Sequence, residues 1–481
     1  MSQRLKRTLL LNWSRGKTYC VACVRPDFLL NDRVQPMCDL KPVLCVFCCG
    51  VMLSLSDIAP AQLLTPQQAD TVKQTANELD HALWAQVEPA YLVMDRQKGG
   101  YRLSSNSSSD VRDNIHQARM TWVAAEIARL YPDKGQAYKA FAEHGLNFLA
   151  RKMWDNEQGG FFFKTDPDGK LPANWLQEKH VYSNAFSVYA AANAARVLDD
   201  PKLALELAKR GYHWIESHAL DKQHGGYFEA MTLDGKPILT KPATQKRCLD
   251  SIGTAYGYKS MNSHIHLLEA YTELYKVWPD EQLRVSLEKL LVCVRDVICI
   301  EPGALNMFFT RDWRAVPNGN SFGHDVETAF LMTEAAHLLG EPWIEQTQPR
   351  AKLLVDHALE WGYDKEHFGF YDNGRAFRPA YDHEKIWWVQ AEAFNALALM
   401  HQLHGKDNPK YFTAMLQTWA FTRDHMIDDQ GQWHVKLQRD GMPVNGKDAS
   451  KHQPQDIYHS GRAMMHTYHR LMGWLDTSSD H

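Results

Sequence analysis

A turn rich in glycine and aromatic residues recurs six times along this 481-residue chain. Between consecutive turns, about 60 to 80 residues carry apolar side chains at helical spacing, as in 136–153. Each period has room for two helices and a short hairpin-like connector. The six turns are Lys98–Tyr101, Asp155–Phe161, Asp221–Tyr227, Glu301–Ala304, Asp364–Phe370 and Asp429–Trp433.

A repeat of this kind indicates one supersecondary unit used six times. We therefore predict an all-α fold, an (α/α)6 toroid in which an inner ring of helices is wrapped by an outer ring, with short hairpin connectors. The glycines allow a positive φ in the turns. An open superhelical array of the same helix pairs is the alternative. The closed toroid is favoured because there are six repeats and the histidine-bearing segments fall at predicted helix starts.

The N-terminal region carries a different pattern. The apolar run 43–55 is too short to cross a bilayer as a helix, and Ala59-Pro60-Ala61 follows it with small residues at both ends. This pattern predicts a signal peptide within 37–61 and export to the periplasm or the medium; without processing the chain would stay in the cytoplasm. We expect 1–61 to be an extension plus this leader, and 62–481 to be one catalytic barrel.

Charge and cysteine content exclude several classes of protein. A net charge of −4 without a long basic run argues against nucleic-acid binding, and no membrane span is expected after the leader. Six of nine cysteines precede residue 50, and the Cys20–Cys23 pair has no second pair to complete a zinc site. No metal is therefore predicted.

Histidines stand at or near three predicted helix starts, far apart in the chain. His266 is followed three residues later by Glu269, and His324 in the same way by Glu327. Residues i and i+3 share a helix face, so each glutamate is predicted to hold its histidine in one orientation. His459 is the third. Histidines near their neutral pKa are suited to moving protons.

The position of each side chain on its helix indicates whether it packs in the core or lies in a site. His264 falls within the apolar stripe of its helix and is predicted to be a packed, hydrogen-bonded core residue, whereas His266 lies away from that stripe. Trp387 and Trp388 face different ways on one helix, so one can pack while the other lines a cavity. A buried Glu392 needs a partner such as a site histidine or a sugar hydroxyl.

These residues lie in segments that resemble the N-acylglucosamine 2-epimerase superfamily and, within it, the cellobiose 2-epimerases. The similar segments occur in order over most of residues 70–475. The Trp-Trp-Val-Gln-Ala-Glu-Ala and His-Ile-His-Leu-Leu-Glu strings carry the resemblance to the cellobiose enzymes. The segments are Gln117–Trp122, Lys179–Tyr182 with Ala185–Phe186, Met261–Tyr275, Gly323–Glu327, Trp387–Ala393 and Tyr458–Arg462.

The resemblance implies an (α/α)6 barrel that inverts C2 of a reducing-end sugar through a cis-enediolate. His324 and His459 match the two acid/base positions, Glu327 the residue that orients His324, and His266 a third histidine near O1. No metal, nucleotide or nicotinamide cofactor is implied, and the partner is a small sugar. A monomer or weak dimer is expected. The positions that match substrate-contacting or supporting residues are Arg119, Tyr182, Phe186, Trp387, Trp388 and Glu392.

Several other functions stay open from sequence alone. Within the superfamily, the chain could be a mannose isomerase or an N-acylglucosamine 2-epimerase, or could act on mannobiose. Outside it, a glycoside hydrolase on the same barrel would use a carboxylate pair. A non-catalytic sugar-binding protein and a metal hydrolase built on His264 and His266 are the remaining alternatives. Arg119 in particular fits either a sugar oxygen or a neighbouring carboxylate.

Overall fold

The computed structural model describes residues 64–103, 111–173, 175–444 and 456–479. The predicted signal peptide, the boundary between 61 and 62 and the Cys20–Cys23 pair lie outside these residues. No helix in the described ranges is long and apolar enough to span a lipid bilayer.

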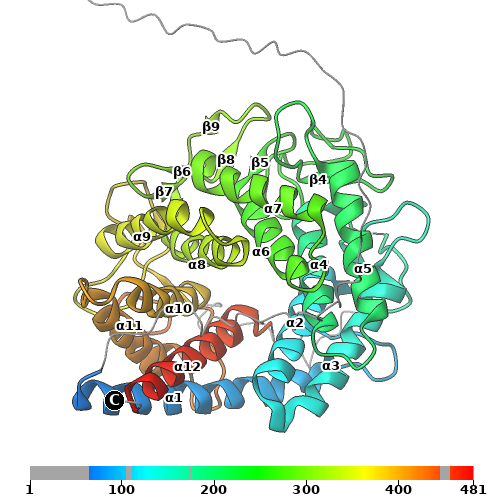
Figure 1. The fold of residues 1–481 in the computed structure, drawn as a ribbon. Coiled ribbons are helices and arrows are strands. Elements are labelled where there is room, and N and C mark those ends of the chain that lie inside the picture. Colours follow the sequence, from blue (N-terminus) through cyan, green and yellow to red (C-terminus); the bar gives the residue numbers. More distant parts are fainter. Residues whose placement is uncertain (1–63, 104–110, 174, 445–455, 480–481) are drawn as a thin grey trace, which may run out of the picture. The chain divides into compact units, whose positions relative to one another are not determined.

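Twelve α-helices make up the described part, and they alternate between two rings (Figure 1). The inner helices contact one another in sequence order, and the ring closes where α12 contacts α2. Helix α1 packs against α12, so the first described helix completes the sixth pair with the last. The inner helices are α2 (Asn114–Leu130), α4 (Val181–Ala195), α6 (Met261–Val277), α8 (Phe322–Leu339), α10 (Trp387–His404) and α12 (Tyr458–Ser479). The outer helices are α1 (Pro66–Ala90), α3 (Gly135–Phe148), α5 (Lys202–Trp214), α7 (Glu281–Val292), α9 (Trp343–Trp361) and α11 (Lys410–Phe421).

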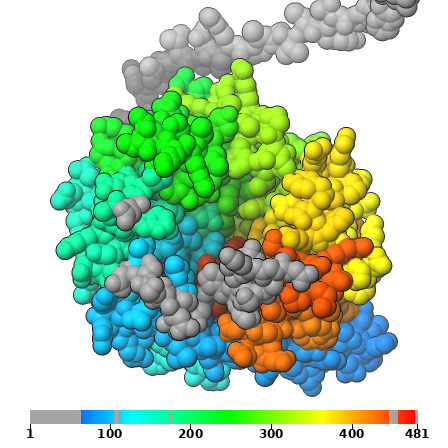
Figure 2. Space-filling model, turned by 180° about the vertical axis from the view of Figure 1, so that it is seen from behind, coloured from blue at the N-terminus to red at the C-terminus, as the bar shows by residue number. Residues whose placement is uncertain are grey.

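The two rings differ in how apolar side chains are spread around each helix. In α4 nearly every residue is buried, and its small alanines let neighbouring helices pack on all sides. In α5 only one side is buried, and its residues are Ala204, Leu207, Ala208, Gly211, Tyr212 and Trp214. Figure 2 shows the sequence colours following one another around the molecule. The predicted (α/α)6 toroid is confirmed.

Short antiparallel strands join the repeats at one end of the barrel. A two- or three-residue strand leads directly into each of the five inner helices α2 to α10, and it pairs with a strand that follows the next outer helix. The inner helices from α2 to α10 therefore start at the same end. Tyr458 and His459, the first residues of α12, contact Glu269 of α6 and Glu392 of α10, so α12 starts at that end as well. These pairs are β1 (Arg112–Asp113) with β2 (Lys164–Thr165), β3 (Glu178–His180) with β4 (Ala230–Thr232), β5 (Lys259–Ser260) with β8 (Phe308–Phe309), β10 (Asn320–Ser321) with β11 (Asn373–Gly374), and β12 (Lys385–Ile386) with β13 (Lys436–Leu437). Three further strands complete the set: β9 (Ala315–Val316) pairs with β8, and β6 (Cys299–Ile300) pairs with β7 (Ala304–Leu305).

The glycine-rich turns are fastened to the barrel by a repeated ion pair. In the second turn, Asp155 accepts hydrogen bonds from two backbone N–H groups of the turn and pairs with Lys179 of β3 at 2.7 Å. Asp221 and Lys259 repeat this arrangement in the third turn, at 3.1 Å. Gly159 has φ +70°, as predicted for these turns.

His264 belongs to this structural repeat. The backbone N–H of Tyr227, just after the third turn, donates to His264 Nε2 at 3.0 Å, and Asn184 accepts from Phe161 in the same way one repeat earlier. Burial lowers the pKa of His264 to about 4, so the ring is a neutral acceptor. The prediction that His264 is a packed core residue is confirmed.

Candidate active site

Three histidines at the starts of inner helices share one mode of attachment. Each ring is held through Nδ1: His266 by Glu269 Oε2 at 2.9 Å on α6, His459 by Glu392 Oε1 at 2.7 Å, and His324 by Ser321 Oγ at 2.6 Å. In the described part of the chain, no hydrogen bond engages Nε2 of any of the three. A ring fixed at Nδ1 presents Nε2 for proton transfer to a ligand.

Arg462 of α12 links its own helix to α6, α8 and α10 at the centre of this group. Its guanidinium is fully buried, and Nη2 donates to Glu327 Oε1 at 2.8 Å and to Glu392 Oε1 at 2.6 Å. Nη1 donates to Glu269 Oε1 and contacts the Tyr458 hydroxyl, which also donates to Glu269. One cation thereby neutralises carboxylates from α6, α8 and α10. Breaking such a network would leave buried charges without compensation.

The two carboxylates that hold histidines sit in unlike surroundings. Burial would raise the pKa of Glu269, but Arg462 and His266 hold it at about 2, and both its oxygens are hydrogen-bonded. Burial raises the pKa of Glu392 despite Arg462, and its Oε2 has no hydrogen-bond partner. Burial, with Arg119 and Arg462, lowers the pKa of His459 well below its usual range, although Glu327 opposes this. His459 therefore stays neutral and able to accept a proton at pH 7.

Trp388 connects the two histidines that match acid/base positions. Its ring centroid lies 4.9 Å from that of His324 and 5.6 Å from that of His459. A Cβ at position 323 would lie 2.6 Å from the Trp388 ring, so only glycine leaves room for this contact. Trp387 also contacts His459, with centroids 5.7 Å apart. The two half-buried tryptophans therefore both line the same group of histidines.

On the α2 and α4 side, Arg119 packs against two aromatic residues, Tyr182 and Phe186, that contact His266. Arg119 pairs with Asp456 at 2.9 Å, donates to the Tyr182 hydroxyl at 3.2 Å, and lies over the Phe186 ring at 4.5 Å. The rings of Tyr182 and Phe186 contact His266, with centroids 5.1 Å and 4.7 Å away. Of the two partners expected for Arg119, the structure shows the neighbouring carboxylate.

The structure differs from the prediction at Glu327. The i+3 spacing indicated that Glu327 would hold His324, as Glu269 holds His266. Instead, Glu327 binds Arg462 and lies 3.7 Å from His459 Nδ1, while Ser321, the N-cap of α8, contacts the His324 ring. The reason is that His324 is in the first turn of its helix, where the cap residue is within reach of the ring and competes for it.

The ten site residues predicted from the sequence lie in one neighbourhood of the structure. The prediction missed three residues that hold them in place, Arg462, Ser321 and Asp456. In the sequence, Arg462 stands out only as the last residue of the segment Tyr458–Arg462 that carries the resemblance. Its role has a signal in hindsight, because several glutamates on inner helices must have a buried cation. Asp456 carried no such signal, because its partner Arg119 lies on a distant helix. Ser321 did have a local signal, since it directly precedes the first turn that carries His324 and serine is a favoured N-cap residue.

The arrangement is suited to proton transfer inside a closed barrel. It offers imidazole nitrogens that are free of hydrogen bonds within the described residues, the faces of aromatic side chains, and a guanidinium, that of Arg119, beside them. The ligand atoms of Glu327, Glu392 and His459 are close enough for a metal ion, but Arg462 already lies between the two carboxylates. These residues therefore have their cation within the chain.

Comparison with known proteins agrees with this geometry. A cellobiose 2-epimerase from Bacteroides fragilis is 28% identical over 395 residues, which cover 80% of this chain and 96% of that protein. A D-mannose isomerase from Thermobifida fusca is 26% identical over 421 residues, covering 80% and 93%. The solved structure of cellobiose 2-epimerase from Spirochaeta thermophila superposes with a TM-score of 0.71 at 27% identity, over 85% of this chain and 99% of that one. Residues 99–463 match the N-acylglucosamine 2-epimerase family, and the chain, a carbohydrate isomerase, belongs to it.

Proposed function

We propose that this enzyme inverts C2 of the reducing-end glucose of a β-1,4-disaccharide, converting cellobiose into 4-O-β-D-glucosyl-D-mannose. The observation that carries the proposal is the shared anchoring of His266, His324 and His459 through Nδ1, which leaves their three Nε2 atoms without a hydrogen bond among the described residues. The relatives named cellobiose 2-epimerase support the choice of substrate.

In the proposed reaction, the sugar binds in its open-chain aldehyde form. One of His324 and His459 removes the proton from C2, and the electron pair of that C–H bond forms the C1=C2 double bond of a cis-enediolate while negative charge moves to O1. The other histidine returns a proton to C2 from the opposite face, which inverts the carbon. In this reaction His266 donates a proton or hydrogen bond to O1, where the charge develops.

The aromatic and charged residues around these histidines supply binding and support. Trp387 and Trp388 offer flat faces on which sugar rings stack, and Arg119 offers a guanidinium edge beside Tyr182 and Phe186. Arg462 is a positioning residue, because it fixes Glu392 and thereby His459. Glu327, bound to Arg462, keeps a negative charge near His459 and favours the imidazolium that forms when that ring takes a proton.

A D-mannose isomerase is the second candidate, favoured by the similarity to the Thermobifida fusca enzyme. The same enediolate gives a ketose when the proton returns to C1 instead of C2. N-acylglucosamine 2-epimerase activity is the variant suggested by the family name.

A glycoside hydrolase is disfavoured by the carboxylates. The oxygens of Glu327 and Glu392 nearest each other both bind Arg462 Nη2, and a hydrolase needs a free carboxylate pair with the sugar between its members.

Separation of products distinguishes these candidates. The purified chain is incubated with cellobiose, mannobiose, mannose and N-acetylglucosamine in turn, and we expect glucosylmannose from the first. His459→Asn keeps a donor for Glu392 and is expected to lose about 10² to 10⁴ of the rate. His81→Gln, on the exposed face of α1, is the matched control and keeps full activity. Fructose from mannose with no product from cellobiose would favour the isomerase, and free glucose from cellobiose a hydrolase.

We also propose that 37–61 direct export, on the strength of the apolar run and the Ala59–Ala61 pattern. The test is N-terminal sequencing of the chain after expression in a bacterium with an outer membrane. We expect a periplasmic product that begins at Gln62. An uncleaved cytoplasmic product that is active would contradict this.

A further inference from the structure

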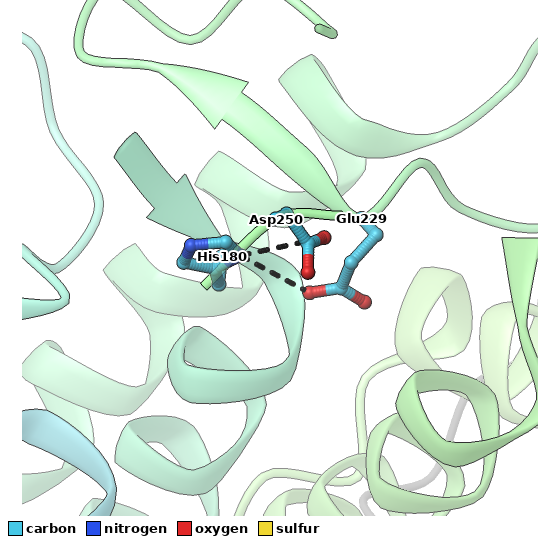
Figure 3. Close-up of side chains that lie close together, drawn as sticks. All are labelled: His180, Glu229 and Asp250. Carbon is cyan, nitrogen blue, oxygen red and sulfur yellow. Dashed lines mark ion pairs between the residues drawn. The ribbon is translucent and has the colours of Figure 1, made fainter. Parts of the chain in front are cut away.

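A second group of buried titratable side chains lies outside the histidine site. His180 ends β3 and is the N-cap of α4, Glu229 directly precedes β4, and Asp250 begins a turn in the segment between β4 and β5. Figure 3 shows the three side chains converging from these three segments. Their exposures are 0%, 3% and 7%, so the group is shielded from water.

The His180 ring lacks the partners that a buried imidazole normally has. His180 Nδ1 lies 3.7 Å from Glu229 Oε1 and 3.9 Å from Asp250 Oδ2, and neither ring nitrogen forms a hydrogen bond. Asp250 Oδ2 is likewise buried without a partner. His180 Nδ1 therefore faces Glu229 Oε1 and Asp250 Oδ2 at distances too long for direct hydrogen bonds. Buried polar atoms usually have a partner, and each exception calls for an explanation.

The group also carries an excess of negative charge. Glu178 adds a third carboxylate, 3.5 Å from His180 Nε2 on the other side of the ring. Among the described residues, no Lys or Arg forms an ion pair with Glu178, Glu229 or Asp250.

We propose that His180, Glu229 and Asp250 bind a divalent transition-metal ion. One imidazole nitrogen and two carboxylate oxygens are ligands that suit Mn²⁺, Zn²⁺ or Fe²⁺. The three candidate ligand atoms lie within 4.8 Å of one another. Bonds of about 2.0 to 2.2 Å in a tetrahedral site put ligand atoms roughly 3.3 to 3.6 Å apart, so small side-chain movements would complete the shell around an ion.

The second oxygens of the carboxylates are already held, which pre-orders the site. Glu229 Oε2 accepts from the Ser263 hydroxyl on α6, and Asp250 Oδ1 accepts from the backbone N–H of Thr254 at 2.9 Å. Supporting hydrogen bonds of this kind orient metal-ligating carboxylates.

The site adjoins the wall that faces His266. Glu229 Oε1 also accepts from the backbone N–H of Tyr182 at 3.3 Å, and Ser263 is three residues before His266 on α6. An ion here would tie the segment carrying Asp250 to α4 and α6 and thereby fix Tyr182. The ion has a positioning role and takes no part in the proton transfers, so the proposal does not depend on which sugar is the substrate.

Direct binding of the metals tests the proposal. The full chain, without a polyhistidine tag, is stripped with a chelator, and Mn²⁺ or Zn²⁺ is titrated by calorimetry while the thermal midpoint is recorded. We expect about one equivalent to bind and the midpoint to rise. Asp250→Asn is expected to weaken binding at least tenfold. Asp234→Asn, an exposed carboxylate paired with Lys236, is the matched control and leaves binding unchanged.

Two results would overturn the assignment. One is the absence of binding by the wild-type chain, and the other is binding that both Asp250→Asn and Glu229→Gln leave unchanged, which would place the ion elsewhere. Because no sugar is present, either result is independent of whether the enzyme acts on cellobiose.

Discussion

Two buried groups in this barrel have the same composition, one histidine and two carboxylates within reach of each other. In the Glu327–Glu392–His459 group, Arg462 lies between the carboxylates and donates to both. In the His180–Glu229–Asp250 group, no Lys or Arg of the described residues takes that place. The comparison shows that a cluster read from residue types alone is ambiguous. The two groups differ in the source of the positive charge. Where an arginine supplies it, the carboxylates are already compensated, and where no Lys or Arg does, a bound ion can supply it.

The largest effect is expected from removing the built-in cation. Arg462→Met keeps the length of the side chain but leaves Glu269, Glu327 and Glu392 without compensation, which should cost about 3 to 5 kcal/mol of unfolding free energy. Urea unfolding measures this. Arg314→Met, whose side chain is 83% exposed, is the control and should stay within about 0.5 kcal/mol of wild type. Equal stability of both variants would mean that Arg462 does not neutralise the cluster.

In the His180–Glu229–Asp250 group, removing a charge is expected to change the unfolding free energy less, and any change should be a gain in stability. In chelator-stripped protein, Asp250→Asn relieves repulsion with Glu229 and keeps an oxygen for the turn N–H groups, so stability should stay within about 1 kcal/mol of wild type or increase. The same unfolding experiment checks this. A loss as large as that of Arg462→Met would show that Asp250 stabilises the fold through a protonated His180, and the two groups would then be alike.

The smallest effect concerns acid sensitivity in the Arg462 group. Because the folded-state pKa of His459 is lowered, the unfolded chain takes up a proton that the folded chain does not as the pH falls below about 6.5. The stability contribution is therefore complete above that pH and is lost on acidification. Between about pH 7.5 and about pH 5.5, wild type should lose more stability than His459→Asn. An equal loss in both would mean that His459 titrates normally.

The fold was predictable because its signals are local and repeated. Six glycine-rich turns and helical spacing between them indicated the paired helices, and segments without charged side chains, such as α4, belong inside. The same local logic worked at His266 and Glu269, which both lie beyond the first turn of α6 and out of reach of its N-cap. It failed at His324 and Glu327 for two reasons. His324 lies in the first turn of α8, within reach of the N-cap Ser321, and Glu327 forms an ion pair with Arg462 instead.

What could not be predicted depends on contacts between distant segments. Arg462 forms ion pairs with carboxylates on three other helices, and no spacing in the sequence predicts those pairs. His180 had appeared only within a segment that resembles the epimerases, and Glu229 and Asp250 had no motif. Their grouping arises from β3 pairing with β4 and from the turn that begins at Asp250. The metal proposal therefore departs from the sequence-based expectation that no metal is bound.

Exchange of the C2 hydrogen tests the central claim most directly. Cellobiose is incubated with the enzyme in deuterated buffer and both epimers are followed by NMR. If His324 and His459 remove and return the proton, deuterium enters at C2 of the reducing-end residue, and either histidine variant slows its entry. Glucosylmannose that forms without deuterium at C2, or labelling that survives loss of both imidazoles, would contradict the account.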